Sequence, residues 1–213
     1  MTPSKCIGWQ IMEKCTLCND GWSMTDREAI PCKCAIERKI QSRLPLHYLR
    51  AKLTDFPEEI ARLVTNSLAA PVSGLLIMGP TGTGKTHLAA AICRDLMERG
   101  QEVRFVTCER YYSDLRESYR DASSEDAVIG PLELGPLLVL DDLGAGSLSD
   151  HERRSTLALL TRRINANRPT IVTTNWPLQK IEQFMDDRIA SRLAGFRKIE
   201  LVGTDQRLSP ALN

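Results

Sequence analysis

The segment Gly79-Pro80-Thr81-Gly82-Thr83-Gly84-Lys85-Thr86 constrains the fold of this chain more than any other part of the sequence. It follows the apolar run Leu75–Met78 and opens an alanine-rich stretch, so it is predicted to join a buried strand to a helix. Glycines at such a turn let backbone N–H groups surround phosphate oxygens, and the helix N-terminus adds its dipole. Lys85 can then reach the β- and γ-phosphates, and the Thr86 hydroxyl can ligate Mg²⁺. A plain glycine-rich turn before a core helix is the alternative, but motif and context together favour a nucleotide site formed by residues 79–86.

The size and charge of the chain limit the classes of protein that it can belong to. Its 213 residues are enough for one well-packed domain and a small appendage, and its net charge of +1 does not announce a nucleic-acid partner. No apolar stretch approaches the roughly 20 residues of a membrane span, and the first residues lack the apolar region of a signal peptide. We therefore expect a cytoplasmic protein without a membrane partner, whose cysteines bind metal or pack rather than form disulfides.

The composition changes near residue 45. Residues 1–45 hold five of the seven cysteines and two of the three tryptophans, and they show little apolar periodicity. We predict a small metal-stapled domain at 1–45, a linker at 46–74 with a helix from about Pro57 to Ala69, and the main domain at 75–213.

In the main domain, apolar runs alternate with helical patterns. Parallel strands are predicted at Leu75–Met78, Val103–Val106, Leu137–Leu140, Thr170–Thr173 and Ile199–Val202. Helices are predicted at Lys85–Arg99, Glu109–Arg120, His151–Asn167 and about Asp186–Ala194. Asp150 is the expected N-cap of the third helix and Gly195 the expected C-cap of the fourth. This alternation predicts an α/β fold, with five parallel strands between two layers of helices.

Polar residues follow two of the predicted strands. Leu137–Leu140 ends in Asp141 and Asp142, a pattern typical of a Walker B strand. Asp141 would hold Mg²⁺, and Asp142 would orient and polarise the attacking water. Asn175 ends the next strand, where it can contact the γ-phosphate or that water, as a sensor I residue does. A strand that simply ends in a polar turn is the alternative.

Two arginines, Arg188 and Arg192, lie four residues apart and so share one helix face. Their guanidinium groups suit phosphate contact, and an arginine here can reach the nucleotide of a neighbouring subunit. A solvated pair, or a pair bound to Asp186 and Asp187, explains the spacing equally well.

Together these motifs, in this order, resemble the AAA+ ATPases, and the chain is most similar to helicase loaders of the DnaC/DnaI type and to the related IstB-like ATPases. The resemblance covers about Leu46 to Leu208. It implies the sheet order 5-1-4-3-2, with Arg192 as the finger and Arg188 as its companion, in a homo-oligomer. The chain ends soon after the fifth strand, so the lid domain is expected to be reduced or absent, and Arg207 is given no lid role. Gly146 departs from relatives that carry an acid there.

The resemblance also points to a DNA contact. In replication initiators and loaders, an extra helix after the second strand contacts single-stranded DNA, and here that position is the helix Glu109–Arg120. Arg116, Tyr119 and Arg120 are the expected contacts, since tyrosines stack on bases and arginines bind phosphates. An amphipathic surface helix that packs Tyr112 and Leu115 is an equal alternative.

The cysteines form a pattern of their own. Cys15-Thr16-Leu17-Cys18 and Cys32-Lys33-Cys34 supply four thiolates in two close pairs, which suits a closed tetrahedral Zn²⁺ site. An iron–sulfur cluster, a redox pair or ordinary buried cysteines are the alternatives. Cys6 is a possible alternate ligand, whereas Cys93 and Cys108 are expected in the core.

Some of the resembling loaders carry an N-terminal zinc domain that grips the replicative helicase. This implies an ATP-dependent helicase loader, which needs ATP, Mg²⁺ and Zn²⁺ and controls assembly and release by slow, oligomer-dependent hydrolysis. Trp9 and Trp22 are then partner contacts, or they pack around the metal. An IstB-like ATPase that remodels target DNA for a transposase is the alternative, and an ATP-regulated adaptor with negligible turnover is a third.

Overall fold

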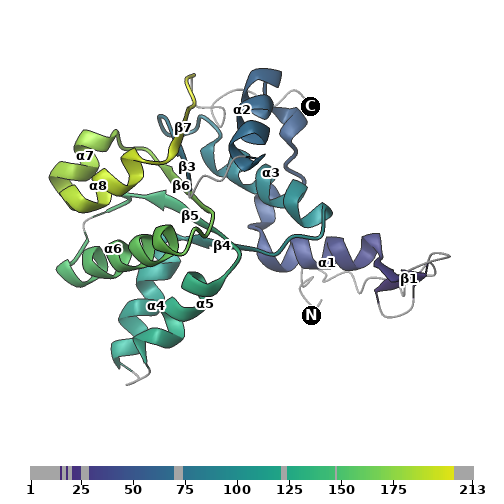
Figure 1. The fold of residues 1–213 in the computed structure, drawn as a ribbon, viewed down its shortest axis with the longest axis horizontal. Helices are drawn as coiled ribbons and strands as arrows, with labels where there is room; N and C mark the ends of the chain where they lie inside the picture. Colours follow the sequence, from purple (N-terminus) through teal and green to yellow (C-terminus); the bar gives the residue numbers. More distant parts are fainter. Residues whose placement is uncertain are drawn as a thin grey trace, which may run out of the picture.

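A computed structural model of the chain describes Cys15, Cys18 and residues 21–24, 29–69, 74–120, 124–146 and 148–203. Its centre is a five-stranded parallel sheet with helices on both faces (Figure 1). Among the described residues no helix is long and apolar enough to cross a membrane.

The strands follow the predicted order. They are β3 (Gly74–Met78), β4 (Val103–Thr107), β5 (Leu137–Leu143), β6 (Thr170–Thr174) and β7 (Arg197–Glu200). Across the sheet they run β4-β5-β6-β3-β7, with every neighbouring pair parallel. Counted from β3, this is the order 5-1-4-3-2, which confirms the predicted topology. The carboxyl ends of β3, β5 and β6 are adjacent, so the loops that follow them meet at one edge.

The last strand begins earlier than predicted. β7 covers Arg197–Glu200 rather than Ile199–Val202, and it pairs with β3 from Leu75–Arg197 to Met78–Glu200. Only Ile199 of this edge strand is buried. The apolar-run criterion therefore missed Arg197 and Lys198, because an exposed edge strand tolerates charged residues.

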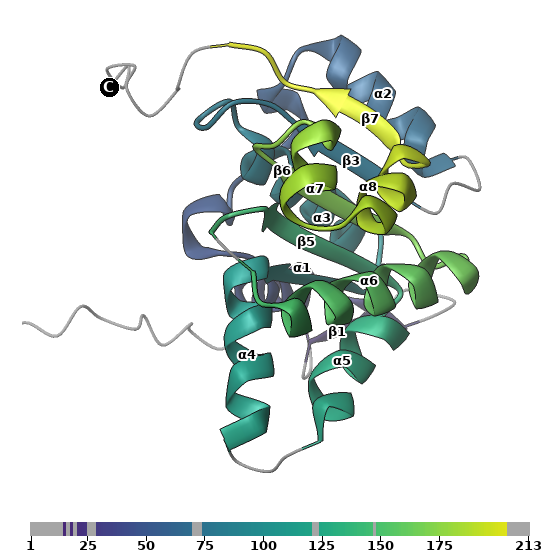
Figure 2. The same ribbon diagram turned by 90° about the vertical axis from the view of Figure 1, so that its left-hand side faces the viewer.

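The two faces of the sheet are covered by different helices. Leu75 and Ile77 point to one side and pack against α3 (Lys85–Glu98) and the N-terminal helices, whereas Leu76 points to the other side. That second side is covered by α4 (Cys108–Arg120), α5 (Glu125–Leu134), α6 (Asp150–Asn165), α7 (Leu178–Phe184) and α8 (Asp187–Ala194). Figure 2 shows α7 and α8 over the sheet, with α4 and α5 extending beyond its β4 edge. Cys93 and Cys108 are buried on opposite sides, as predicted.

Two of these helices were not predicted, and one cap was assigned wrongly. Gly130-Pro131 suggests a break, yet α5 continues through Pro131 because Ser124 caps it and Ile129 and Leu132 are buried. Helix α7 is too short to show a periodicity. Helix α6 is capped by Ser149, not Asp150, since Ser149 forms a capping box with Glu152.

The N-terminal region begins with a short hairpin of β1 (Trp22–Met24) and β2 (Ala29–Pro31). It continues as α1 (Lys33–Arg43), the short 3₁₀ helices η1 (Leu46–Tyr48) and η2 (Leu53–Asp55), and α2 (Glu58–Ala69). Ile40 and Leu44 of α1 are buried in the same core as α3, and Glu37 pairs with Arg94 of α3. Helix α1 therefore connects the hairpin to the main domain, and the domain boundary at residue 45 stays a prediction.

Candidate nucleotide and metal sites

The predicted phosphate loop lies between β3 and α3 and is held open by its own contacts. Gly82 and Gly84 have φ values of 80° and 92°, which glycine adopts without strain. The Thr83 hydroxyl and the Lys85 ammonium both donate to the carbonyl of Pro80, at 2.9 and 2.7 Å. Lys85 is only 7% exposed. Its charge is therefore directed into the loop, where a phosphate would be bound.

Gly79 has a different role in the loop. Its φ is 150°, and a Cβ atom there would lie 2.2 Å from the carbonyl oxygen of Leu201. Leu201 is fixed in place because its N–H donates to the carbonyl of Met78 at 2.7 Å. The first glycine of the motif thus lets the chain after β7 cross the phosphate loop.

We expect Gly79→Ala to lower the free energy of unfolding by roughly 3 kcal/mol, because backbone must move and the conformation is strained. Denaturant unfolding measures the loss. Gly100→Ala is the matched control: its φ is also positive, at 81°, but no atom lies within 4 Å of the added carbon. Equal losses in the two variants would contradict the close-approach argument.

Asp141 joins the phosphate loop to the neighbouring strand. Its carboxylate is 4% exposed and accepts hydrogen bonds from the Thr86 hydroxyl at 3.1 Å and the Thr173 hydroxyl at 2.7 Å. Burial raises the pKa of this carboxyl group, whereas the hydroxyl donors and Lys85 oppose the rise. A carboxylate and a hydroxyl at this separation fit two adjacent ligands of Mg²⁺, which lie about 3 Å apart in an octahedron of oxygens.

Asp142 and Asn175 meet at the same edge of the sheet. The Asn175 amide donates to the Asp142 carboxylate at 3.0 Å, although Asp142 lies near the end of β5 and Asn175 follows β6. Asp142 has a φ of 62°, and its N–H donates to the Thr173 hydroxyl at 2.8 Å. Thr173 therefore contacts both aspartates. The sequence analysis missed it because a threonine in a buried strand looks like an ordinary β-former.

These residues line a cavity of about 280 Å³. The phosphate loop, Asp142, Thr173 and Asn175 form one part of its wall, and Tyr48 and His87 form another. The His87 ring bonds Asp55 at 2.9 Å and lies edge-on to Phe56, 5.2 Å between ring centroids. Tyr48 comes from the segment predicted as a linker. Aromatic rings beside a phosphate site suit the flat face of a nucleobase.

Trp176 contacts the segment that follows the paired aspartates. Gly144 has a φ of 94°, and a Cβ atom there would lie 2.8 Å from the Trp176 ring. The Lys180 ammonium sits 4.5 Å from the centre of that ring. No local pattern in the sequence indicates this contact, since it joins two loops that are distant in the chain.

The two arginines of α8 have different surroundings. Arg188 is bound to Asp186 through two hydrogen bonds, of 3.0 and 2.9 Å, and this contact lowers the pKa of Asp186 to about 2. Arg192 donates only to the carbonyl of Arg188 among the described contacts, at 3.1 Å. The charge of Arg192 therefore has no acidic partner within the described part of this chain.

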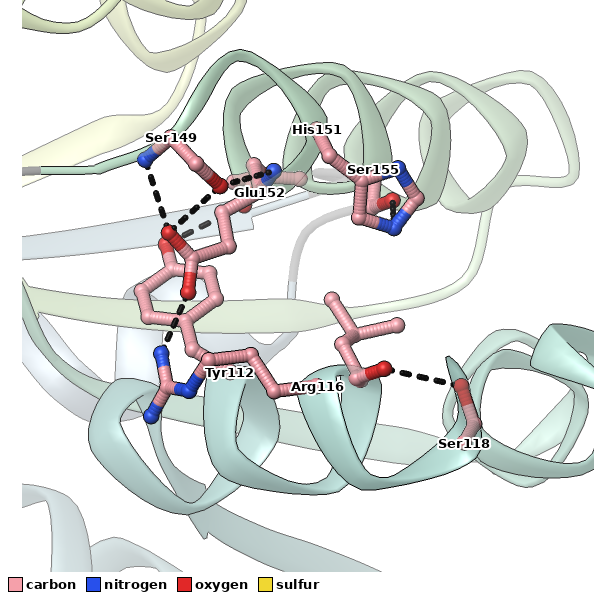
Figure 3. Close-up of polar contacts among 9 residues, drawn as sticks. Tyr112, Arg116, Ser118, Ser149, His151, Glu152 and Ser155 are labelled. Carbon is pink, nitrogen blue, oxygen red and sulfur yellow. Dashed lines mark hydrogen bonds and ion pairs between the residues drawn. The ribbon is translucent and has the colours of Figure 1, made fainter. Parts of the chain in front are cut away.

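Helix α4 packs as the amphipathic alternative anticipated. Tyr112 and Leu115 are buried against the sheet side, whereas Tyr119 is 63% exposed. Arg116 pairs with Glu152 of α6 (Figure 3), and the Tyr119 hydroxyl bonds His151 of α6. Arg116, Tyr119 and Arg120 remain predicted DNA contacts, but two of them also tie α4 to α6.

The four cysteines of the N-terminal region come together. The sulfur atoms of Cys15, Cys18, Cys32 and Cys34 all lie within 4.8 Å of one another. The separation is 3.9 Å between Cys15 and Cys32, and 3.4 Å between Cys18 and Cys34. Zn–S bonds of about 2.3 Å place tetrahedral sulfurs about 3.8 Å apart, so this donor set fits zinc. Cys6 and Trp9 lie outside the described residues, as do Arg207 and the expected position of the lid.

Local structure explains why these cysteines meet. The hairpin β1–β2 brings the two pairs together, and the N–H of Cys32 donates to the carbonyl of Gly21 at 2.7 Å. Cys32 caps α1 and Cys34 lies in its first turn. Two of the four cysteines therefore lie at the N-terminus of α1, where the helix dipole presents its positive end. Trp22 is 54% exposed beside this cluster.

The fold and the site thus define a P-loop nucleotide-binding protein with the sheet order of AAA+ ATPases. The chain belongs to the family described as IstB-like ATP binding protein, whose model matches residues 48–194.

Individual relatives point in two functional directions. The chain is 30% identical over 134 residues to the replicative helicase loader DnaC of Escherichia coli strain K12, covering 62% of this chain and 55% of the relative. It is 27% identical over 148 residues to the insertion sequence IS1162 putative ATP-binding protein of Pseudomonas fluorescens, covering 65% and 63%. A crystal structure of DnaI matches with a TM-score of 0.66 and 25% identity, over 80% of this chain and 100% of the other. The chain spans about half the length of the curated relatives that it matches first.

Proposed function

We propose that this protein is an ATP-dependent helicase loader that works in the cytoplasm. Its main domain, residues 75–213, binds and hydrolyses ATP with Mg²⁺ and assembles into a homo-oligomer on single-stranded DNA. Its N-terminal domain, residues 1–45, holds Zn²⁺ on four cysteines and binds a replicative DNA helicase. Nucleotide binding then controls assembly, and hydrolysis controls release.

One observation carries the enzymatic part of this proposal. Thr86, Asp142 and Asn175 come from three different segments and line the same cavity, and hydrogen bonds join Thr86 to the buried Asp141 and Asn175 to Asp142. Thr86 and Asp141 suit the magnesium ion, Asp142 suits the attacking water, and Asn175 fixes the orientation of Asp142. An adaptor that only binds nucleotide has no need of this arrangement.

Lys85→Ala is expected to weaken ATP binding by about 100-fold, because a buried ammonium that bonds two phosphates is lost. Isothermal titration with a non-hydrolysable ATP analogue measures the affinity. Lys180→Ala removes a lysine near the same edge without entering the cavity, and its affinity should stay unchanged. Unaltered affinity in Lys85→Ala would exclude the phosphate-loop assignment.

Two observations support the helicase partner over other partners. The cysteine cluster includes the start of α1, next to the β1–β2 hairpin, which lies at the outside of the main domain as a partner-binding arm requires (Figure 1). The relatives DnaC and DnaI are replicative helicase loaders.

The second candidate function is a transposition ATPase that remodels target DNA for a transposase. The family model and the insertion-sequence relative favour it, and the ATP site serves either function equally. The two candidates therefore differ in partner rather than in chemistry.

A pull-down with the full chain decides between them. The tagged protein is incubated with lysate of its native host and ATP, and the retained proteins are identified by mass spectrometry. Retention of a replicative helicase supports the loader, and retention of a transposase supports the alternative. Retention of the helicase should be lost with Cys15→Ser but kept with Cys93→Ala, in which the metal cluster is intact.

A further inference from the structure

Glu152 occupies an unusual position for a carboxylate. It lies in the first turn of α6 and is only 5% exposed. One of its oxygens accepts hydrogen bonds from the N–H and the hydroxyl of Ser149, both at 2.8 Å, and the other accepts from Arg116 at 2.5 Å (Figure 3). Burial opposes ionisation, but the donors of Ser149 and Arg116 outweigh it and lower the pKa of Glu152. The carboxylate is therefore charged and relies on these two partners.

The Arg116 side chain of α4 has one side that is paired and another that is exposed. One nitrogen of its guanidinium group bonds Glu152, whereas its side chain is 58% exposed. No contact of its other nitrogens is found among the described residues. A guanidinium group carries five N–H donors in a planar fork, so the free side can bind a phosphate. Arg116 is thus the point where an external anion can act on a buried acid.

Glu152 also fixes one end of the segment that carries the predicted catalytic residue. Asp142 and Leu143 end β5, and Ser149, which Glu152 holds, caps α6 a few residues later. Near its start the same segment contacts Trp176 at Gly144. Trp176 and Glu152 thus contact the chain at Gly144 and at Ser149, two described positions between Asp142 and the body of α6.

Further hydrogen bonds join α4 to α6. The Tyr112 hydroxyl bonds Thr156 at 3.1 Å, and Thr156 in turn donates to the carbonyl of Glu152 at 2.7 Å. The Tyr119 hydroxyl bonds His151 at 3.0 Å. Among these contacts, only the Arg116–Glu152 pair joins two charged side chains. It is also the contact that a phosphate at the protein surface can reach.

We propose that Arg116 is a positioning residue that couples phosphate binding on α4 to the segment after Asp142. A nucleic-acid phosphate that engages the exposed side of Arg116 competes with Glu152 for the same cation. Because a buried carboxylate that loses its cation is costly, the start of α6 and the segment before it readjust. This inference rests on the proposed DNA and ATP binding, and it deepens them by naming the residue pair that links the two sites.

The experiment follows the segment directly. Hydrogen exchange of residues 143–150 is measured in the full chain with a non-hydrolysable ATP analogue, with and without a saturating labelled oligo(dT). Fluorescence anisotropy of the same oligonucleotide gives the affinity. We expect oligo(dT) to change the exchange rate of this segment at least about fivefold in the wild type, a typical coupling factor between two sites.

Variants of Arg116 and Glu152 distinguish coupling between the two sites from a simple contact of Arg116 with the oligonucleotide. Arg116→Gln and Glu152→Gln should each abolish the exchange change at saturating oligo(dT), and the double variant should add nothing further. Arg116→Lys, which restores the charge, should recover part of it. Arg110→Gln is the matched control, since Arg110 lies on the same helix but pairs with Asp114 of α4 itself. It should behave as the wild type.

Two results would overturn the inference in distinguishable ways. If the wild type binds oligo(dT) but the exchange of residues 143–150 is unchanged, or if Arg116→Gln only weakens affinity and keeps the full change, the coupling is wrong while the proposed function stands. If the wild type binds no oligo(dT), the DNA part of the proposed function fails, and the coupling fails with it.

Discussion

Cys15→Ser is expected to abolish the zinc binding proposed for the four cysteines and to unfold the hairpin that presents Trp22. Structural zinc sites of this kind contribute about 10 kcal/mol or more of binding free energy at neutral pH, and the hairpin has little apolar core to replace it. Without the metal, thiols share hydrogen bonds only, and the contact with Cys34 raises the pKa of the Cys18 thiol to about 12. Zinc favours the thiolates and so holds the two cysteine pairs together.

Elemental analysis of the purified chain should find about one zinc ion per chain, and none after Cys15→Ser. The main domain should remain folded, because α1 is anchored to it by Ile40 and Leu44. Cys93→Ala is the control, since that thiol is buried in α3 far along the chain from the cluster and its loss should leave the zinc content unchanged. Visible absorption by the untreated protein would identify an iron–sulfur cluster instead.

The second large effect is expected at Arg192. Arg192→Ala should lower the rate of ATP hydrolysis by about 10³-fold or more, as the loss of an arginine finger does, while ATP binding stays within about twofold. The reason is that Arg192 has no acidic partner among the described residues, so its charge is available to a neighbouring nucleotide. Steady-state phosphate release and analogue titration measure the two quantities.

A mixing experiment distinguishes a finger in trans from a residue that acts within its own subunit. Lys85→Ala binds nucleotide only weakly but keeps Arg192, and Arg192→Ala keeps its nucleotide site. An equimolar mixture should therefore recover activity that neither variant shows alone. Arg62→Ala, an exposed arginine on α2, is the surface control. Normal hydrolysis by Arg192→Ala alone would exclude the finger, and Arg188, held by Asp186, would be tested next.

Predictions from the sequence agree best with the structure where backbone chemistry dictates the local conformation. The strand, glycine loop and helix around Lys85 were predicted because each residue type has a local physical reason. The sheet order came from the resemblance and was confirmed, since parallel strands joined by helices allow few arrangements. Asp141 and Asn175 follow from their places at strand ends.

The errors have equally specific causes. Helix α5 was missed because Gly130 and Pro131 locally oppose a helix, although burial of Ile129 and Leu132 outweighs them. β7 was shifted because a charged edge strand lacks an apolar run. Tyr48 was not predicted to line the cavity, since nothing in its neighbours indicates that η1 approaches the phosphate loop.

The sequence by itself thus determined the residue types of the nucleotide site, the strand ends on which they lie and the two cysteine pairs, because these follow from local backbone requirements. Only the tertiary structure decided which side chains meet. It brought Thr173 onto Asp141, Trp176 onto Gly144 and Arg116 onto Glu152, in each case across segments far apart in the chain. Such contacts depend on how helices and loops pack on the sheet, and packing is set by the whole core rather than by any local pattern.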